Sequence, residues 1–95
     1  MVNYKSDDNT ISIGSKPFMN YVNAVVIQFG TQKEVKLISR GKFISKCVDV
    51  AEVTVKKFLK DVKVADIKID SQEFENKEGK KITVSTMDII LKKYN

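Results

Sequence analysis

Residues 40–46 read Arg-Gly-Lys-Phe-Ile-Ser-Lys and mark the point at which a strand pattern gives way to a helix pattern. Before them, residues 34–40 alternate loosely between polar and apolar side chains, which predicts a buried strand. After them, apolar residues recur at spacings of three and four until about Asp61, which predicts a long amphipathic helix. We therefore expect a strand followed at once by a helix, with the three cations Arg40, Lys42 and Lys46 at the junction.

A similar junction lies earlier in the chain. Ile11 and Ile13 predict a short strand, and residues 14–17 read Gly-Ser-Lys-Pro, a helix start in which Pro17 suits the first helical position. Gly30 supplies a stop signal for this helix. The apolar stripe between them has helical spacing and consists of Phe18, Tyr21, Val22, Val25, Val26 and Phe29.

The last third of the chain predicts two long strands, residues 64–74 and 82–94, joined by a hairpin. The turn falls at residues 76–80, where Gly79 can adopt the positive φ that such turns require. Residues 1–9 are polar and unpatterned and predict a flexible N-terminal tail, so residues 10–95 form the one expected domain. The strand side chains expected to face inward are Val35, Leu37, Ile38, Ile67, Ile69, Met87, Ile89 and Leu91.

The order strand, helix, strand, helix, strand, strand predicts an α+β fold. We expect a two-layer sandwich with a four-stranded mixed sheet, two helices on one face and a long hairpin between the last two strands. A right-handed crossover makes the first two strands parallel, so both strand-to-helix junctions emerge at one sheet edge. Lys16, Arg40, Lys42 and Lys46 should then form a basic face beside two helix N-termini, which themselves favour anions.

Composition points the same way. The 95 residues carry 17 Lys and Arg against 12 Asp and Glu, a net charge of +5, so the expected attraction is to a polyanion: DNA, RNA or an acidic membrane surface. No residue is histidine, and Cys47 is the single cysteine, so we expect no catalytic site, metal site, cofactor or disulfide, and a reducing intracellular setting. No apolar run approaches the length of a membrane span. The small core favours a homodimer.

The residues around the two junctions resemble the Alba family of archaeal chromatin proteins. The matching pieces cover roughly residues 10–93 and are residues 14–22, 40–42, 44–49, 71–72 and 84–86. The resemblance implies a homodimer of the predicted fold that binds duplex DNA, and RNA, with little sequence preference, in a cytoplasmic protein associated with the chromosome or nucleoid. It places Lys16, Arg40 and Lys42 on the nucleic acid and the long hairpin along the minor groove.

Further candidate residues surround this face. Asn20 and Tyr21 open the first predicted helix near Lys16, although Tyr21 also has the spacing of the core stripe. Phe58 is either a core residue or the exposed aromatic by which some relatives of the family join dimer to dimer, a higher assembly on DNA. The hairpin cations expected to approach nucleic acid are Lys77, Lys80 and Lys81.

The chain departs from the family pattern in three places. Ser15 stands where many relatives carry a first lysine, and Lys42 stands where many carry arginine, which pairs with phosphate in a bidentate manner. Residues 73–81 hold three acids and three lysines, so the hairpin has no net charge and gains little from counterion release. This predicts modest affinity, a different docking geometry, or base-edge readout in place of a phosphate clamp.

Two other functions are compatible with the basic face. One is an RNA-directed role in ribonucleoprotein assembly or RNA processing, since such a face alone does not distinguish A-form from B-form helices. The other is a protein-interaction module whose basic face meets an acidic protein.

Overall fold

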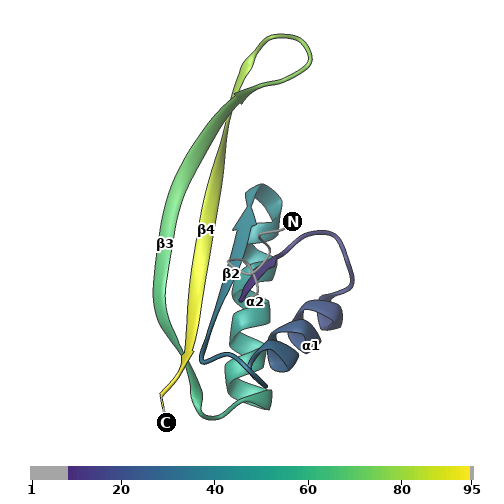
Figure 1. The fold of residues 1–95 in the computed structure, drawn as a ribbon. Helices are drawn as coiled ribbons and strands as arrows, with labels where there is room; N and C mark the ends of the chain where they lie inside the picture. The colour runs from purple at the N-terminus through teal and green to yellow at the C-terminus, as the bar shows by residue number, and fades with distance from the viewer. Residues whose placement is uncertain (1–8, 95) are drawn as a thin grey trace, which may run out of the picture.

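The computed structural model describes residues 9–94, and within them the predicted α+β fold is confirmed. Figure 1 shows a curved sheet with two helices on one side and a hairpin that projects well beyond them. The elements follow the order β1 (Thr10–Ser12), α1 (Phe18–Gln28), β2 (Glu34–Arg40), a short 3-10 turn η2 (Gly41–Phe43), α2 (Ile44–Val53), a π-helical turn η3 (Thr54–Phe58), β3 (Val62–Glu75) and β4 (Lys81–Lys93).

The strand order in the sheet is β1-β2-β4-β3. β1 pairs parallel to β2, with Ser12 opposite Ile38, while the β2–β4 and β4–β3 pairs are antiparallel. Because β1 and β2 run in the same direction, the turn into α1 and the turn into α2 leave the sheet at the same edge, as the sequence predicted. The proposed N-terminal tail lies outside the described residues except for Asn9, whose carbonyl accepts a 2.7 Å hydrogen bond from the Lys36 N–H.

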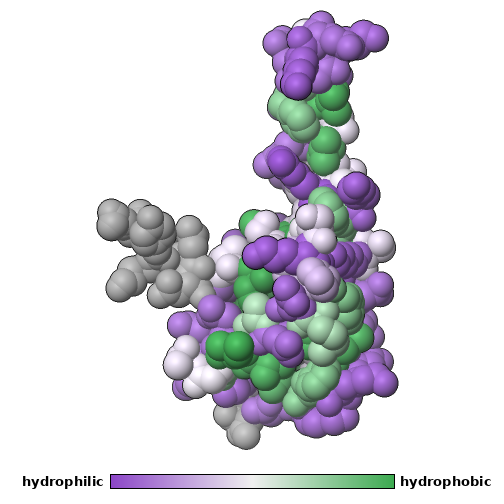
Figure 2. Space-filling model, turned by 90° about the vertical axis from the view of Figure 1, so that its right-hand side faces the viewer, coloured by the Kyte–Doolittle hydropathy of each residue, from purple (hydrophilic) through white to green (hydrophobic). Residues whose placement is uncertain are grey.

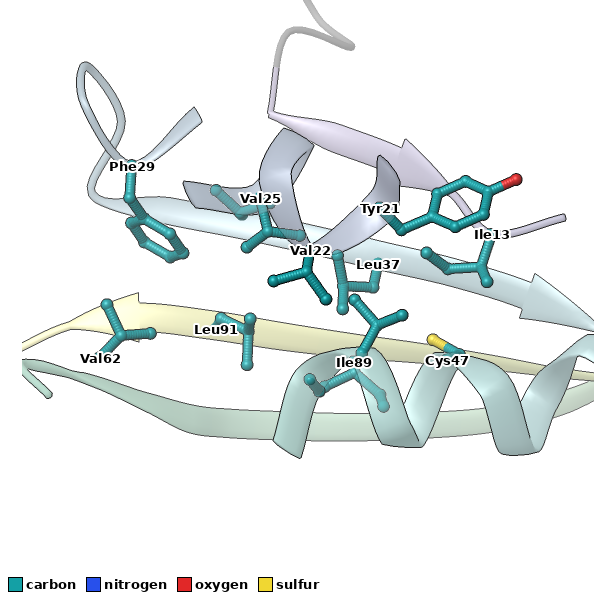
Figure 3. Packing of buried hydrophobic residues seen from close by; sticks show 13 residues of the cluster. Ile13, Tyr21, Val22, Val25, Phe29, Leu37, Cys47, Val62, Ile89 and Leu91 are labelled. Carbon is teal, nitrogen blue, oxygen red and sulfur yellow. The ribbon is translucent and has the colours of Figure 1, made fainter. Parts of the chain in front are cut away.

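The core lies between the helices and the central strands (Figure 3). Val35 and Leu37 of β2 lie opposite Leu91 and Ile89 of β4, and all of these side chains are buried. Because side chains alternate between the two faces along β2, the next inward position belongs to Ser39. Its hydroxyl donates a 3.1 Å hydrogen bond to the Met87 carbonyl. The prediction that Ile38 faces inward was therefore wrong, because a period of two places it on the open face of the sheet.

Two inward predictions on β3 are right about the side of the sheet and wrong about burial. Ile67 pairs with Ile89 and Ile69 with Met87, so both isoleucines share the helix-facing side of the sheet. However, Ile67 is 52% and Ile69 75% exposed. β3 is the edge strand, and α2 packs over β2 and β4, so the helix layer stops short of these side chains.

The helix ends differ slightly from the prediction. Pro17 precedes α1 as its N-cap residue, with ψ at 146°, instead of occupying the first helical position. α2 is regular to Val53 and then widens into η3, where the Thr54 carbonyl accepts a 2.8 Å hydrogen bond from the Leu59 N–H. Helical structure thus ends at Phe58, before Asp61, and the wide turn leaves Phe58 49% exposed.

The β3–β4 hairpin forms an arm, which we define as residues 71–85. It gives the molecule its long dimension of 49 Å, against 32 Å and 24 Å in the other directions. At its tip the Asn76 side-chain oxygen accepts hydrogen bonds from the N–H groups of Glu78 (2.9 Å) and Lys80 (3.0 Å), and Gly79 has a φ of 81°. The predicted hairpin turn is confirmed. Figure 2 shows a hydrophilic tip and apolar patches on the shaft of the arm.

Candidate nucleic-acid interface

The turn before α1, residues 14–16, is held by Tyr21. The Tyr21 hydroxyl accepts hydrogen bonds from the backbone N–H groups of Gly14 (3.0 Å) and Lys16 (3.1 Å). Tyr21 as a whole is only 8% exposed, because it belongs to the core stripe of α1. Tyr21 thus fixes the backbone that carries Lys16, and its direct contact with nucleic acid stays a prediction.

Lys46 holds the same turn from the other side. Its ammonium group donates hydrogen bonds to the carbonyl oxygens of Gly14 (2.7 Å) and Lys16 (2.6 Å) and lies 5.1 Å from the centre of the Tyr21 ring. Two of its three donors are therefore satisfied inside the protein, and the ring face attracts the charge further. One donor is left for a phosphate, so the predicted contact at Lys46 is untested.

The turn after β2 depends on glycine. Gly41 has a φ of 58°, a left-handed conformation that side chains with a Cβ adopt at a cost. This conformation turns the chain sharply from the extended Arg40 into η2 and then into α2. Arg40 and Lys42 are both exposed on either side of it. The ion pairs within residues 9–94 join Lys56 to Glu52 and Lys92 to Glu34, so neither Arg40 nor Lys42 is neutralised there.

The two turns come together as the sequence predicted. Lys46 lies in the first turn of α2, directly after η2, and its ammonium group reaches the backbone at residues 14–16. The exposed side chains of Lys16, Arg40 and Lys42 thus belong to neighbouring turns at one sheet edge. We call these three residues the basic edge. Asn20 is exposed in the first turn of α1, four residues after Lys16.

The arm has two different faces. Glu75 lies opposite Lys81, and Glu73 opposite Thr83, on one side of the ladder, while Phe74 lies opposite Ile82 on the other. Lys77, Lys80 and Lys81 are exposed toward the tip, as expected. The apolar pair was missed at the sequence level. Residues 73–75 alternate between acidic and apolar side chains, and this pattern indicates the apolar pair once the hairpin register is known.

Phe58 follows Lys56 and Lys57 at the end of η3, and all three are exposed. Of the two readings of Phe58, the exposed aromatic fits the structure and the core residue does not. Its use between dimers stays a prediction.

Other features of the described residues give little indication of a catalytic or metal site. Cys47 is buried, and burial raises the pKa of its thiol, partly offset by a hydrogen bond with Ser39. Residues 9–94 contain no cluster of three or more histidine, cysteine or acidic residues suited to a metal ion. No helix among them is long and apolar enough to cross a membrane.

Comparison with known proteins agrees with this geometry. The model of the Alba family matches residues 9–71. The chain is 47% identical over 88 residues to the DNA/RNA-binding protein Alba of Methanocella arvoryzae, and the match covers 92% of each chain. It is 46% identical over 87 residues to the DNA/RNA-binding protein Alba 1 of Archaeoglobus fulgidus, and that match covers 90% of this chain and 97% of the relative. Among solved structures, Alba from Thermoplasma volcanium superposes with a TM-score of 0.84 at 43% identity, over 90% of this chain and all of the other.

Proposed function

This chain belongs to the Alba family, and from that premise we propose that it is an architectural protein that binds duplex DNA, and RNA, as a homodimer. In this role it organises archaeal chromatin, which places it with the chromosome or nucleoid. The family consists of non-enzymatic nucleic-acid-binding proteins, and the chain is not an enzyme. The names of its relatives, which specify both DNA and RNA, support the choice of ligand.

The single observation that carries the proposal is the bridge from Lys46 to the turn at residues 14–16. It fastens two junctions that lie about thirty residues apart in sequence, so that Lys16, Arg40 and Lys42 share one edge. Side chains of this kind neutralise phosphates and release condensed counterions. Phosphate contacts position a protein on the duplex without reading its sequence, which suits a packaging role.

An exposed apolar strip supports the homodimer. It consists of Ile67 and Ile69 on β3, where Ile69 lines one hollow with the partly buried Ile44 and Met87, and of Val48, which lies one helical turn after Ile44 on α2. A contiguous apolar surface of this kind is usually covered in the functional state, and a two-fold partner offers the same patch in return. The dimer would present two basic edges and two arms to one duplex.

RNA is the second candidate ligand, because the names of the relatives mention RNA as well as DNA. A titration against duplex DNA, duplex RNA and an acidic protein, each at two salt concentrations, separates the alternatives. We expect both nucleic acids to bind with an affinity that falls steeply with salt. Binding to the acidic protein alone would establish the protein-interaction module instead, and binding to RNA alone would establish the RNA-directed role.

A further inference from the structure

The arm carries an aromatic side chain with no cover in the described structure. Phe74 is 44% exposed and lies directly opposite Ile82, which is partly buried, on the side of the ladder away from Glu73 and Glu75. The helices lie over the body of the sheet and do not reach this part of the hairpin (Figure 1). An apolar pair at such a place is a candidate contact surface.

Charge alone gives the arm little means of binding a polyanion. Lys77, Lys80 and Lys81 are offset by Glu73, Glu75 and Glu78, so the arm as a whole gains little from counterion release. A large contribution from the arm to binding therefore needs a further source besides charge. The apolar pair is the surface of the arm that offers one.

The apolar pair lies on the same face of the sheet as Arg40, one residue of the basic edge. Arg40 lies opposite Thr86 in the ladder, and Val84 and Ile82 follow on the same side by alternation. Val84 sits against the Gly41 turn, where a Cβ built on the glycine would meet its Cγ1 at 3.6 Å. On this face, Thr86, Val84 and Ile82 lead along β4 from Arg40 to Phe74, with Asp70 opposite Thr86 on β3.

The spacing along this surface suits a duplex. Thr86 and Ile82 are four positions apart in β4, which corresponds to about 13 Å of strand. Consecutive phosphates on one DNA strand advance about 3.4 Å along the helix axis, so the ring lies roughly four base steps from a phosphate held at Arg40. Cations at the basic edge and at the tip bracket the apolar pair, which fits a polyanion with apolar base faces better than it fits an uncharged partner.

We propose that Phe74, supported by Ile82, is a wedge that inserts part-way between two base pairs of duplex DNA. This inference rests on the proposed function and adds a specific contact to it. Apolar side chains that enter a duplex in this way unstack a base step and bend the helix. Pyrimidine–purine steps unstack most easily and A-tracts resist, so the wedge introduces a preference for flexible DNA without any base-specific hydrogen bond.

The test uses the full chain and short duplexes in which a fluorescent adenine analogue occupies either a flexible TA step or a stiff A-tract. We expect the parent protein to raise the emission at the TA step, because unstacking relieves quenching, and to bind that duplex several-fold more tightly. Phe74→Ala should abolish the rise and weaken binding about tenfold, as typical of a lost aromatic–base contact, with an unchanged salt slope. Phe74→Leu should retain much of both effects.

Ile27→Ala is the matched control, since Ile27 is 73% exposed but lies on α1, away from the arm. It should behave as the parent does. Equal emission and affinity for the parent and Phe74→Ala would overturn the wedge, as would a loss of affinity without any emission change in the parent. A fall in the oligomeric state of Phe74→Ala would also overturn it, because a second copy would then cover the ring. Failure of the parent to bind any duplex would instead refute the proposed function.

Discussion

The ammonium group of Lys46 donates a 2.6 Å hydrogen bond to the backbone carbonyl of Lys16, so the first turn of α2 is fastened to the turn that precedes α1. A second bond of 2.7 Å to Gly14 doubles this connection, and Tyr21 fixes the N–H groups of the same segment. Of the predicted basic face, Lys46 therefore helps to fix the backbone position of Lys16. The geometry of the basic edge depends on this link.

Replacing Lys46 by methionine keeps an unbranched side chain that is one atom shorter and removes both hydrogen bonds. We expect a loss of about 1–3 kcal/mol in the free energy of unfolding, since bonds from a charged donor are among the stronger ones in proteins. Urea titration measures this loss. Lys42→Met is the matched control, because the Lys42 ammonium group has no hydrogen bond or ion pair within residues 9–94. Equal stability of the two variants would show that the Lys46 link contributes nothing.

Replacing Gly41 by alanine tests the turn between Arg40 and Lys42. The space at this position is adequate, so the penalty should come from the positive φ and amount to about 1–2 kcal/mol of unfolding free energy. Gly41→Asn should cost less, because asparagine tolerates the left-handed region. Equal costs for alanine and asparagine in urea titration would point to a steric cause instead.

The sequence predicted the topology because each element carries its own local pattern. Alternation also predicted which side of β3 Ile67 and Ile69 occupy, but it carries no information on how far the helix layer extends, and this decided their exposure. The partners of Lys46 depended on the packing of α2 against the turn at residues 14–16, and no local pattern encodes that distance. The exposed pair of Phe74 and Ile82 could be recognised only once the pairing register of the hairpin was known.

Replacing Ile69 by glutamate tests the homodimer, since Ile69 belongs to the apolar strip and is 75% exposed. Burying an unpaired carboxylate in an interface is costly, so we expect the variant to sediment as a monomer near 10.8 kDa at micromolar concentration, while the parent sediments at twice that mass. Ile27→Glu, an equally exposed change on α1, should leave the dimer intact. A parent that sediments only as a monomer would refute the homodimer itself.

Replacing Glu73 and Glu75 by lysine tests whether the arm approaches the phosphate backbone. The arm then becomes cationic, so duplex binding should tighten and its salt dependence should steepen by about 0.9 in log–log slope for each new phosphate contact. Binding measured over a series of salt concentrations gives both quantities. An unchanged slope and affinity would place the charged face of the arm away from the duplex.

The salt slope of binding to random-sequence duplex DNA tests the basic edge most directly, when the parent is compared with Arg40→Glu/Lys42→Glu. The control is Lys33→Glu/Lys57→Glu, which makes the same charge change at exposed residues near the start of β2 and the end of η3, away from the basic edge. We expect the Arg40/Lys42 variant to fold normally and to bind all sequences more weakly. It should lose about 1.8 in slope for the two phosphate contacts of each chain, or about 3.6 for a dimer that places both basic edges on one duplex. The control should keep most of the parent's slope. A folded Arg40/Lys42 variant that binds random duplex as tightly as the parent at low salt would contradict the proposed interface.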